Sequence, residues 1–157
     1  MTSSIACTPS AAAIEPGCVI QLDCSTCQPK KAAGAGGQGD EIVIADGNFP
    51  CHTISQNVVR ADGLSGSEIL EAVMELFPLD TYAENQVFLM EVVPGDDYKP
   101  EIWNDYKEIL KKSDEPFKIG YIERFAFYDR AKKSYAVIAT GEEALYANII
   151  LKKGVVK

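Results

Sequence analysis

The side chains of this sequence that can bind a ligand or transfer protons are mostly carboxylates, amides and phenols. Asp46 directly follows the apolar run Ile42–Ala45, and a carboxylate at the end of a buried strand must be exposed, paired or ligand-facing. Tyr146 and Asn148 open a later apolar run, on alternate positions that share one face of a strand. Such groups match the hydroxyls of a neutral, polyhydroxylated ligand, and no phosphate-binding loop or dinucleotide signature accompanies them.

Two other polar residues are open to both a functional and a structural interpretation. His52 is the only histidine and lies in a polar loop near the end of the first predicted strand, at the edge where α/β proteins usually bind ligands. A loop histidine that makes one hydrogen bond is the alternative. Asp80 precedes Thr81 and Tyr82, so it fits an Asx turn as well as a site.

Tyr128 belongs to an aromatic cluster whose composition favours core packing over a site. Two arginines, Arg124 and Arg130, flank this cluster, and we expect them to pair with Asp129 or Glu123.

The cysteines indicate neither a disulfide framework nor a metal centre. Cys24 and Cys27 have zinc or redox spacing, with Cys7 and Cys18 as further ligands, but a single C-x-x-C without a second pair is a weak signal. Of the five cysteines only Cys51 lies outside residues 1–36, so we expect no metal and a reduced, cytoplasmic setting.

The elements that must position these side chains alternate between strands and helices. Ser65 and Glu68 form a capping-box signal for one helix, which Pro78 ends, and Pro100 fits the first position of another. The apolar faces predicted for these two helices comprise Ile69, Leu70, Val73, Leu76 and Phe77, and then Ile102, Tyr106, Ile109 and Leu110. A third helix is expected over 124–133, and strands over 42–45, 57–61, 86–93, 118–122, 134–140 and 148–151. This alternation predicts an α/β domain with a parallel or mixed sheet flanked by helices.

Length and charge exclude several classes of function. The chain has 157 residues, enough for one domain with one core. Its net charge is 15 − 23 = −8, all of it within residues 37–157, which argues against nucleic-acid binding. No apolar run reaches the roughly 18 residues needed to cross a membrane. Residues 1–36 are rich in Pro, Gly and Cys, and we expect them to form a poorly ordered arm before the domain at 37–157.

Residues 37–157 resemble the family that contains the L-fucose mutarotases and D-ribose pyranases. The resemblance is carried by GDEIVIAD (39–46), NFP (48–50), VRADG (59–63), PLDTY (78–82), MEVVPGD (90–96), ERFAFYDRAKK (123–133), ATGE (139–142) and YANIILKKGV (146–155), in that order. The segments VRADG, PLDTY and FYDRAK point to the fucose branch of the family.

The resemblance implies an α/β sugar-binding fold that assembles into cyclic, often decameric, homo-oligomers. It also implies cofactor-free interconversion of the α and β anomers of L-fucose. The family's substrate-binding residues correspond to Asp46, Asp80, Tyr146 and Asn148, with Arg124 near the pocket, and Tyr128 corresponds to a catalytic tyrosine.

One departure from the family pattern bears directly on activity. Gln38 occupies the position of the family's proton-donor histidine, and the helix that precedes this position in the family is absent. An amide binds a sugar hydroxyl but does not shuttle protons, and losing such a group typically costs about a hundred- to ten-thousandfold in rate. Three interpretations follow: a weakened mutarotase that relies on Tyr128 with His52, a non-catalytic fucose-binding paralogue, or a shifted reading of the gene over residues 1–36. An oligomeric scaffold without sugar binding is the remaining alternative.

Overall fold

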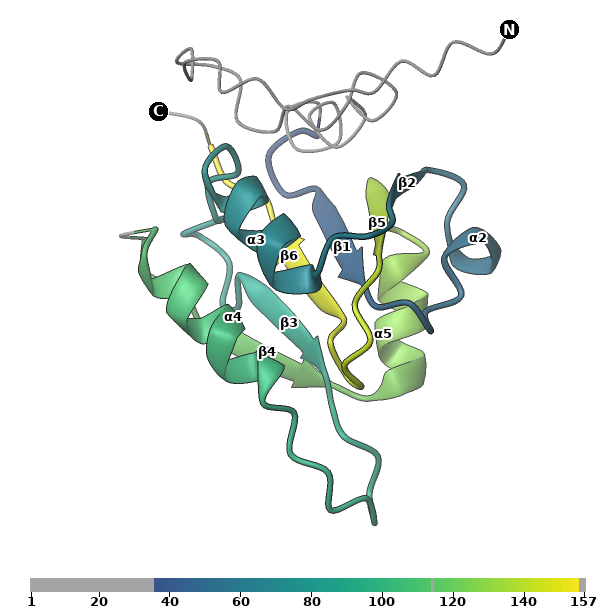
Figure 1. The fold of residues 1–157 in the computed structure, drawn as a ribbon. Helices are drawn as coiled ribbons and strands as arrows, with labels where there is room; N and C mark the ends of the chain where they lie inside the picture. The colour runs from purple at the N-terminus through teal and green to yellow at the C-terminus, as the bar shows by residue number, and fades with distance from the viewer. Residues whose placement is uncertain (1–35, 114, 156–157) are drawn as a thin grey trace, which may run out of the picture.

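The computed structural model describes residues 36–113 and 115–155, which form one sheet between two layers of helices (Figure 1). The strands lie in the order β2 (Val58–Ala61), β5 (Ala136–Thr140), β1 (Glu41–Ala45), β6 (Ile149–Lys152), β3 (Val87–Met90) and β4 (Ile119–Ile122). β6 is antiparallel to both its neighbours, β1 and β3, whereas the other pairs are parallel. The predicted α/β fold with a mixed sheet is therefore confirmed.

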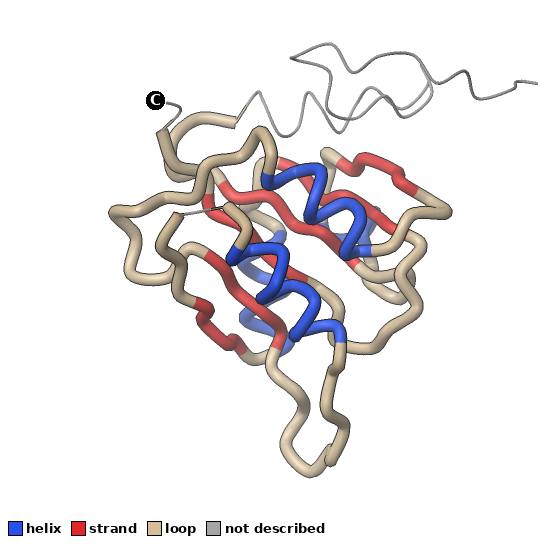
Figure 2. The backbone as a smooth tube through the Cα atoms, turned by 60° about the vertical axis from the view of Figure 1, so that its left-hand side comes forward, coloured by secondary structure: helices blue, strands red, loops and turns tan. Residues whose placement is uncertain are grey.

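The helices cover both faces of the sheet (Figures 1 and 2). α3 (Gly66–Met74) and α4 (Ile102–Lys111) lie on one face, and α5 (Arg124–Ala131) lies with the short α2 (Cys51–Ile54) on the other. Alternation along β1 explains the two layers, because Ile42 and Ile44 pack beneath α3 and α4 while Val43 and Ala45 pack with Phe127 of α5. A strand buried on both faces reads as a continuous apolar run, as this one does.

The reversed strand β6 determines which residues meet at each edge of the sheet. One edge, called here the carboxyl edge, carries the last residues of β1 to β5 and the first residues of β6. Asp46 follows β1 there, Asn148 precedes β6, and Arg124 opens α5 directly after β4. The opposite edge, called the amino edge, carries the start of β1 and the end of β6, where Gly39 N donates a hydrogen bond to Lys153 O.

The capping box of α3 and the apolar face of α4 are confirmed, but Pro100 is not the first residue of α4, because it precedes the N-cap residue Glu101. The Glu68 amide donates to Ser65 Oγ at 3.2 Å, and the Ser65 amide donates to Glu68 Oε2 at 2.8 Å, which completes the capping box. The face predicted for α4 is buried against the sheet and α3, and it consists of Ile102, Tyr106, Ile109 and Leu110.

The helix predictions were wrong in two further places. Residues 51–54 form the short helix α2, although Pro50 and its neighbours predicted only a loop. α3 ends at Met74, so Leu76 lies beyond the helix and is 38% exposed, although Phe77 is buried as expected.

Two expectations about the site's surroundings were also wrong. Tyr146 lies outside β6 with a positive φ of 58°, so it does not alternate with Asn148 along a strand. The two arginines make other contacts than those expected: Arg130 pairs with Glu41 of β1, and Arg124 lies over the ring of Phe125.

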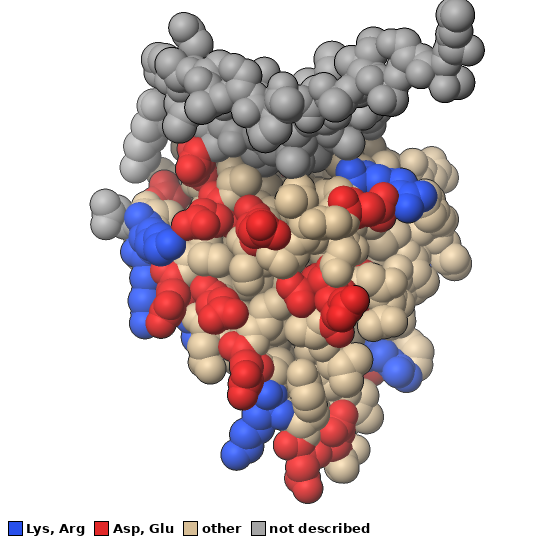
Figure 3. All heavy atoms as spheres, in the orientation of Figure 1, with Lys and Arg blue, Asp and Glu red and all other residues tan. Residues whose placement is uncertain are grey.

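Acidic side chains predominate on the molecular face that carries α3 and α4 (Figure 3). This surface agrees with the net charge of −8 and offers no broad basic patch on that face for a nucleic acid. Within the described ranges, none of the helices is long and apolar enough to cross a membrane.

Candidate functional site

The centre of the candidate site is a reciprocal pair of hydrogen bonds between Asp46 and Asn148. The Asp46 amide donates to Asn148 Oδ1 at 3.0 Å, and Asn148 Nδ2 donates to Asp46 Oδ2 at 2.7 Å. The Asn48 amide donates to the other carboxylate oxygen, Asp46 Oδ1, at 3.0 Å. Both side chains are buried, and this double link locks the end of β1 to the start of β6.

Burial raises the pKa of the Asp46 carboxyl above its ordinary value, because a charge removed from water is less stable. The donors from Asn48 and Asn148 oppose this rise by stabilising the carboxylate. A carboxylate oxygen has two lone pairs, so each oxygen of Asp46 keeps acceptor capacity for a ligand hydroxyl after its bond to the protein.

Tyr146 extends the same site with a phenol. Its hydroxyl donates to Asp96 Oδ2 at 2.9 Å, and its ring lies 6.0 Å from that of Tyr98. Desolvation raises the pKa of the Tyr146 phenol, and the nearby Asp96 carboxylate adds to the rise, so the phenol stays protonated near neutral pH.

α5 brings the remaining polar groups from the other side. Glu123 caps this helix by accepting hydrogen bonds from the amides of Phe125 and Ala126. The half-buried Tyr128 ring packs edge-on against Phe49 with the ring centroids 5.4 Å apart, and the exposed Arg124 begins the helix.

These side chains line one pocket of about 190 Å³ at the carboxyl edge, which we call the Asp46–Tyr146 pocket. Five of the residues predicted from the sequence line it, namely Asp46, Arg124, Tyr128, Tyr146 and Asn148. The apolar wall of this pocket was not predicted from the sequence, and it consists of Phe49, Met90, Val93 and Leu145. Three of these residues lie in segments that carry the family resemblance, Phe49 in NFP (48–50) and Met90 and Val93 in MEVVPGD (90–96).

The structure does not bring Gln38 and Asp80 to this pocket. Gln38 is exposed beside Gly39 at the amino edge. Asp80 lies at the same edge, where its amide donates to Lys152 O and its carboxylate lies 3.5 Å from Lys152 Nζ. The Tyr82 amide donates to Asp80 Oδ1, which is the Asx turn expected from the sequence.

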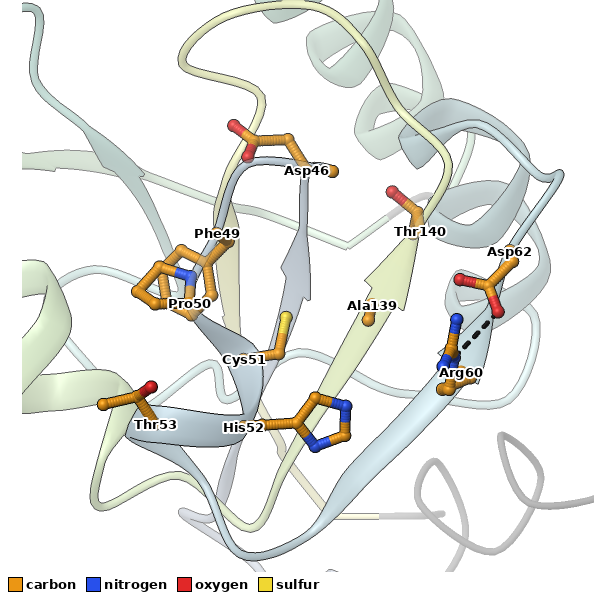
Figure 4. A pocket seen from close by; sticks show the side chains of 11 residues that line it. Asp46, Phe49, Pro50, Cys51, His52, Thr53, Arg60, Asp62, Ala139 and Thr140 are labelled. Carbon is orange, nitrogen blue, oxygen red and sulfur yellow. Dashed lines mark hydrogen bonds and ion pairs between the residues drawn. The ribbon is translucent and has the colours of Figure 1, made fainter.

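His52 lines a second and larger pocket of about 380 Å³, beside the first (Figure 4). Asp46 and Phe49 line both pockets, but His52 points toward the ion pair of Arg60 and Asp62 on the β2 side. His52 is therefore not among the residues that line the Asp46–Tyr146 pocket.

Among the described residues, no three His, Cys, Asp or Glu side chains are grouped in a way that would hold a metal ion. The four N-terminal cysteines considered as ligands, Cys7, Cys18, Cys24 and Cys27, lie outside the described residues. Cys51 is buried, and desolvation raises the pKa of its thiol, so it is a poor nucleophile.

The fold and the Asp46–Tyr146 pocket define an α/β protein equipped to bind a small ligand rich in hydroxyl groups. The chain belongs to the RbsD / FucU transport protein family, whose model matches residues 30–156. The family resemblance noted in the sequence is thus confirmed.

Relatives with named activities cover most of the chain. Fucose mutarotase of Homo sapiens is 50% identical over 125 residues, which are 76% of this chain and 81% of the human protein. L-fucose mutarotase of Actinobacillus pleuropneumoniae serotype 5b is 48% identical over 120 residues, 76% of this chain and 83% of its own. The crystal structure of the fucose mutarotase in complex with L-fucose from Streptococcus pneumoniae matches with a TM-score of 0.74 and 46% identity, over 78% of this chain and 87% of that chain.

Proposed function

We propose that this chain is an L-fucose mutarotase, a cofactor-independent isomerase that interconverts the α and β anomers of the free sugar. The observation that carries the proposal is the convergence of five polar side chains on one small pocket, from the residue after β1, the segment before β6 and α5. Relatives named as fucose mutarotases, at about half identity over three quarters of the chain, support L-fucose as the substrate.

Mutarotation requires two proton transfers. A base removes the proton of the anomeric hydroxyl, the bond between the anomeric carbon and the ring oxygen breaks, and an acid protonates that ring oxygen. Rotation about the single bond between the aldehyde carbon and C2 presents the other face of the carbonyl, and the reverse proton transfers close the ring as the other anomer. In our proposal Tyr128 is one proton-transfer group, because its phenol both donates and accepts.

The other pocket residues bind and orient the sugar. Asp46 accepts hydrogen bonds from sugar hydroxyls, and its link to Asn148 fixes both groups relative to each other. Tyr146 and Arg124 bind from the exposed side of the pocket, where the guanidinium adds donors.

We further propose that the complete site forms between two copies of the chain in a homo-oligomer. Gln38 and Asp80 lie at the amino edge, and β1 alone separates this edge from Asp46 by roughly 15 Å at about 3.3 Å per residue. A monosaccharide cannot span that length, so Gln38 and Asp80 reach a sugar bound near Asp46 only from a neighbouring copy. A cyclic arrangement that repeats this edge-to-edge contact would complete every site, as in the decamer implied by the resemblance.

Gln38 leaves the proposed enzyme without an imidazole at that position. We therefore propose a reduced rate of anomer exchange, with a non-catalytic fucose-binding protein as the second candidate. A cytoplasmic location and an N-terminal arm over residues 1–36 complete the proposal, on the cysteine distribution and composition of the chain.

The test is anomer exchange of L-fucose, measured by NMR saturation transfer for the full chain and for Gln38→His. Exchange above the uncatalysed rate in the unaltered chain supports the enzyme. Exchange only in Gln38→His supports the non-catalytic binding protein, since the pocket is then competent but lacks a proton donor. If neither protein catalyses exchange and neither shows saturable L-fucose binding by titration, the proposed function is wrong.

A further inference from the structure

The segment that carries Tyr146 and Asn148 into the pocket has an unusual backbone. Tyr146 has φ of 58°, and among the described residues it is the one non-glycine residue with a positive φ. A bulky residue in the left-handed region is strained, and such a conformation persists only when surrounding contacts impose it. The contacts that impose it therefore also determine where the phenol of Tyr146 and the amide of Asn148 lie.

Two side chains of α4 bind this segment from behind. The indole Nε1 of Trp103 donates to Tyr146 O at 2.9 Å, and the hydroxyl of Tyr106 donates to Ala147 O at 2.8 Å. Positions 103 and 106 are neighbours on one face of a helix, so the helix holds two successive carbonyls at once. Neither Trp103 nor Tyr106 lines the Asp46–Tyr146 pocket.

The packing around α4 fixes both donors. Tyr106 is fully buried, and a Cβ added at Gly66, the first residue of α3, would lie 2.3 Å from the Tyr106 hydroxyl oxygen. Only glycine at position 66 leaves the phenol room to reach Ala147. Trp103 is fixed by the ring of Tyr121 on β4, with the centroids 5.2 Å apart.

We infer that Trp103 and Tyr106 are positioning residues, which together clamp the Tyr146–Asn148 segment so that its phenol and amide meet the sugar. The clamp positions groups of the proposed sugar site, so this inference rests on the proposed function. The clamp acts through Asn148 on Asp46 as well, because the Asn148 side chain accepts a hydrogen bond from the Asp46 backbone amide and donates one to the Asp46 carboxylate.

The test uses Tyr106→Phe, which removes one hydroxyl and keeps the ring in the core, and Trp103→Phe, which removes the indole donor from a half-buried position. Both are compared with Ile109→Val, a substitution on the buried face of the same helix that leaves the two clamp bonds intact. The first readout is the NMR signal of the Asn148 side-chain amide protons, which needs no ligand. The second is the split between KM and kcat for L-fucose anomer exchange, or the Kd for L-fucose if exchange is undetectable.

We expect the Asn148 amide signals to shift and broaden in both clamp variants and to stay unchanged in Ile109→Val. L-fucose affinity or exchange should fall roughly ten- to hundredfold, since small misplacements of site groups have effects of this size. Unchanged Asn148 signals in folded Tyr106→Phe and Trp103→Phe would overturn the clamp, as would equal effects of Ile109→Val. Absence of L-fucose binding in the unaltered chain overturns the proposed function alone, because the amide signals still report on the clamp.

Discussion

The buried carboxylate of Asp46 links the stability of the protein to pH in the direction opposite to that of a surface ion pair. Its pKa in the folded state is raised by burial, so the folded protein retains a proton that the unfolded chain has already released. The contribution of the protonated Asp46 carboxyl to the free energy of unfolding is fully present below the ordinary pKa of 3.8, and it is lost as the pH rises through the higher pKa of the folded state. We predict that the free energy of unfolding of the unaltered protein, relative to Asp46→Asn, falls from acidic to neutral pH.

A matched control for this prediction is Asp62→Asn. The exposed Asp62 carboxylate accepts a hydrogen bond from Arg60, which lowers its pKa, so its contribution is present above 3.8 and is lost as the pH falls. Urea unfolding at a series of pH values should therefore give differences of opposite slope for the two variants, with a small slope for the exposed pair. Equal slopes would show that Asp46 is not desolvated in the folded protein.

Sequence context predicted only part of the candidate site, whereas Arg124 and Tyr128 were assigned to it by the family resemblance. Asp46 was predicted because a carboxylate directly after a buried apolar run needs a partner, and the structure supplies Asn148 as that partner. Asp96 and Trp103 were not predicted, because their bonds to Tyr146 join segments 50 and 43 residues apart. A pattern within a few residues of sequence carries no information about contacts between segments so far apart along the chain.

Among the elements, α5 depends on a contact with β1 to present Tyr128 and Arg124. Arg130, near the end of this helix, donates through Nε to Glu41 Oε2 at 2.8 Å and forms a second bond to the other oxygen. Its guanidinium also lies 3.5 Å from the centroid of the Phe88 ring. This partly buried, bidentate contact fixes α5 on the sheet, and lysine cannot reproduce it because an ammonium group lacks the planar pair of donors.

We predict that Arg130→Lys lowers the free energy of unfolding by about 1–3 kcal/mol, because it removes a charge-assisted hydrogen bond and the ring contact. The control is Arg60→Lys, in the exposed pair with Asp62, where we expect a much smaller change because solvent screens that pair. Chemical denaturation of both variants at one pH and salt concentration provides the comparison. Equal losses in the two variants would contradict a special role for the Arg130 contact.

Most elements were predictable because their signals are local. The apolar β1 run and the Ser65 capping box each determine an element within a few residues. α2 was missed because four residues after Pro50 give no helical periodicity, and its position comes from Cys51 packing into the core. The pairing of Arg130 was missed for a similar reason, since Glu41 lies 89 residues away and is brought close only by the sheet.

At the scale of the whole molecule, the side chains of the proposed sugar site are divided between the two edges of one sheet. Asp46, Tyr128 and Asn148 lie at the carboxyl edge, while Gln38 and Asp80 lie at the amino edge. The two half-sites that we propose on opposite edges of a chain suit a head-to-tail contact between copies, because such a heterologous contact forms a ring when the rotation between copies closes.

This arrangement predicts complementation between two inactive variants. Asp46→Asn impairs one half-site and Asp80→Asn the other, and both are made in the Gln38→His background so that exchange is fast enough to measure. When the two are unfolded, mixed in equal amounts and refolded together, about a quarter of the interfaces should combine two intact halves and recover activity. Each variant refolded alone should remain inactive, and mixing after assembly should restore nothing until subunits exchange. If each chain carried a complete site of its own, every chain in the mixture would hold one damaged site, and co-refolding would recover no activity at any ratio.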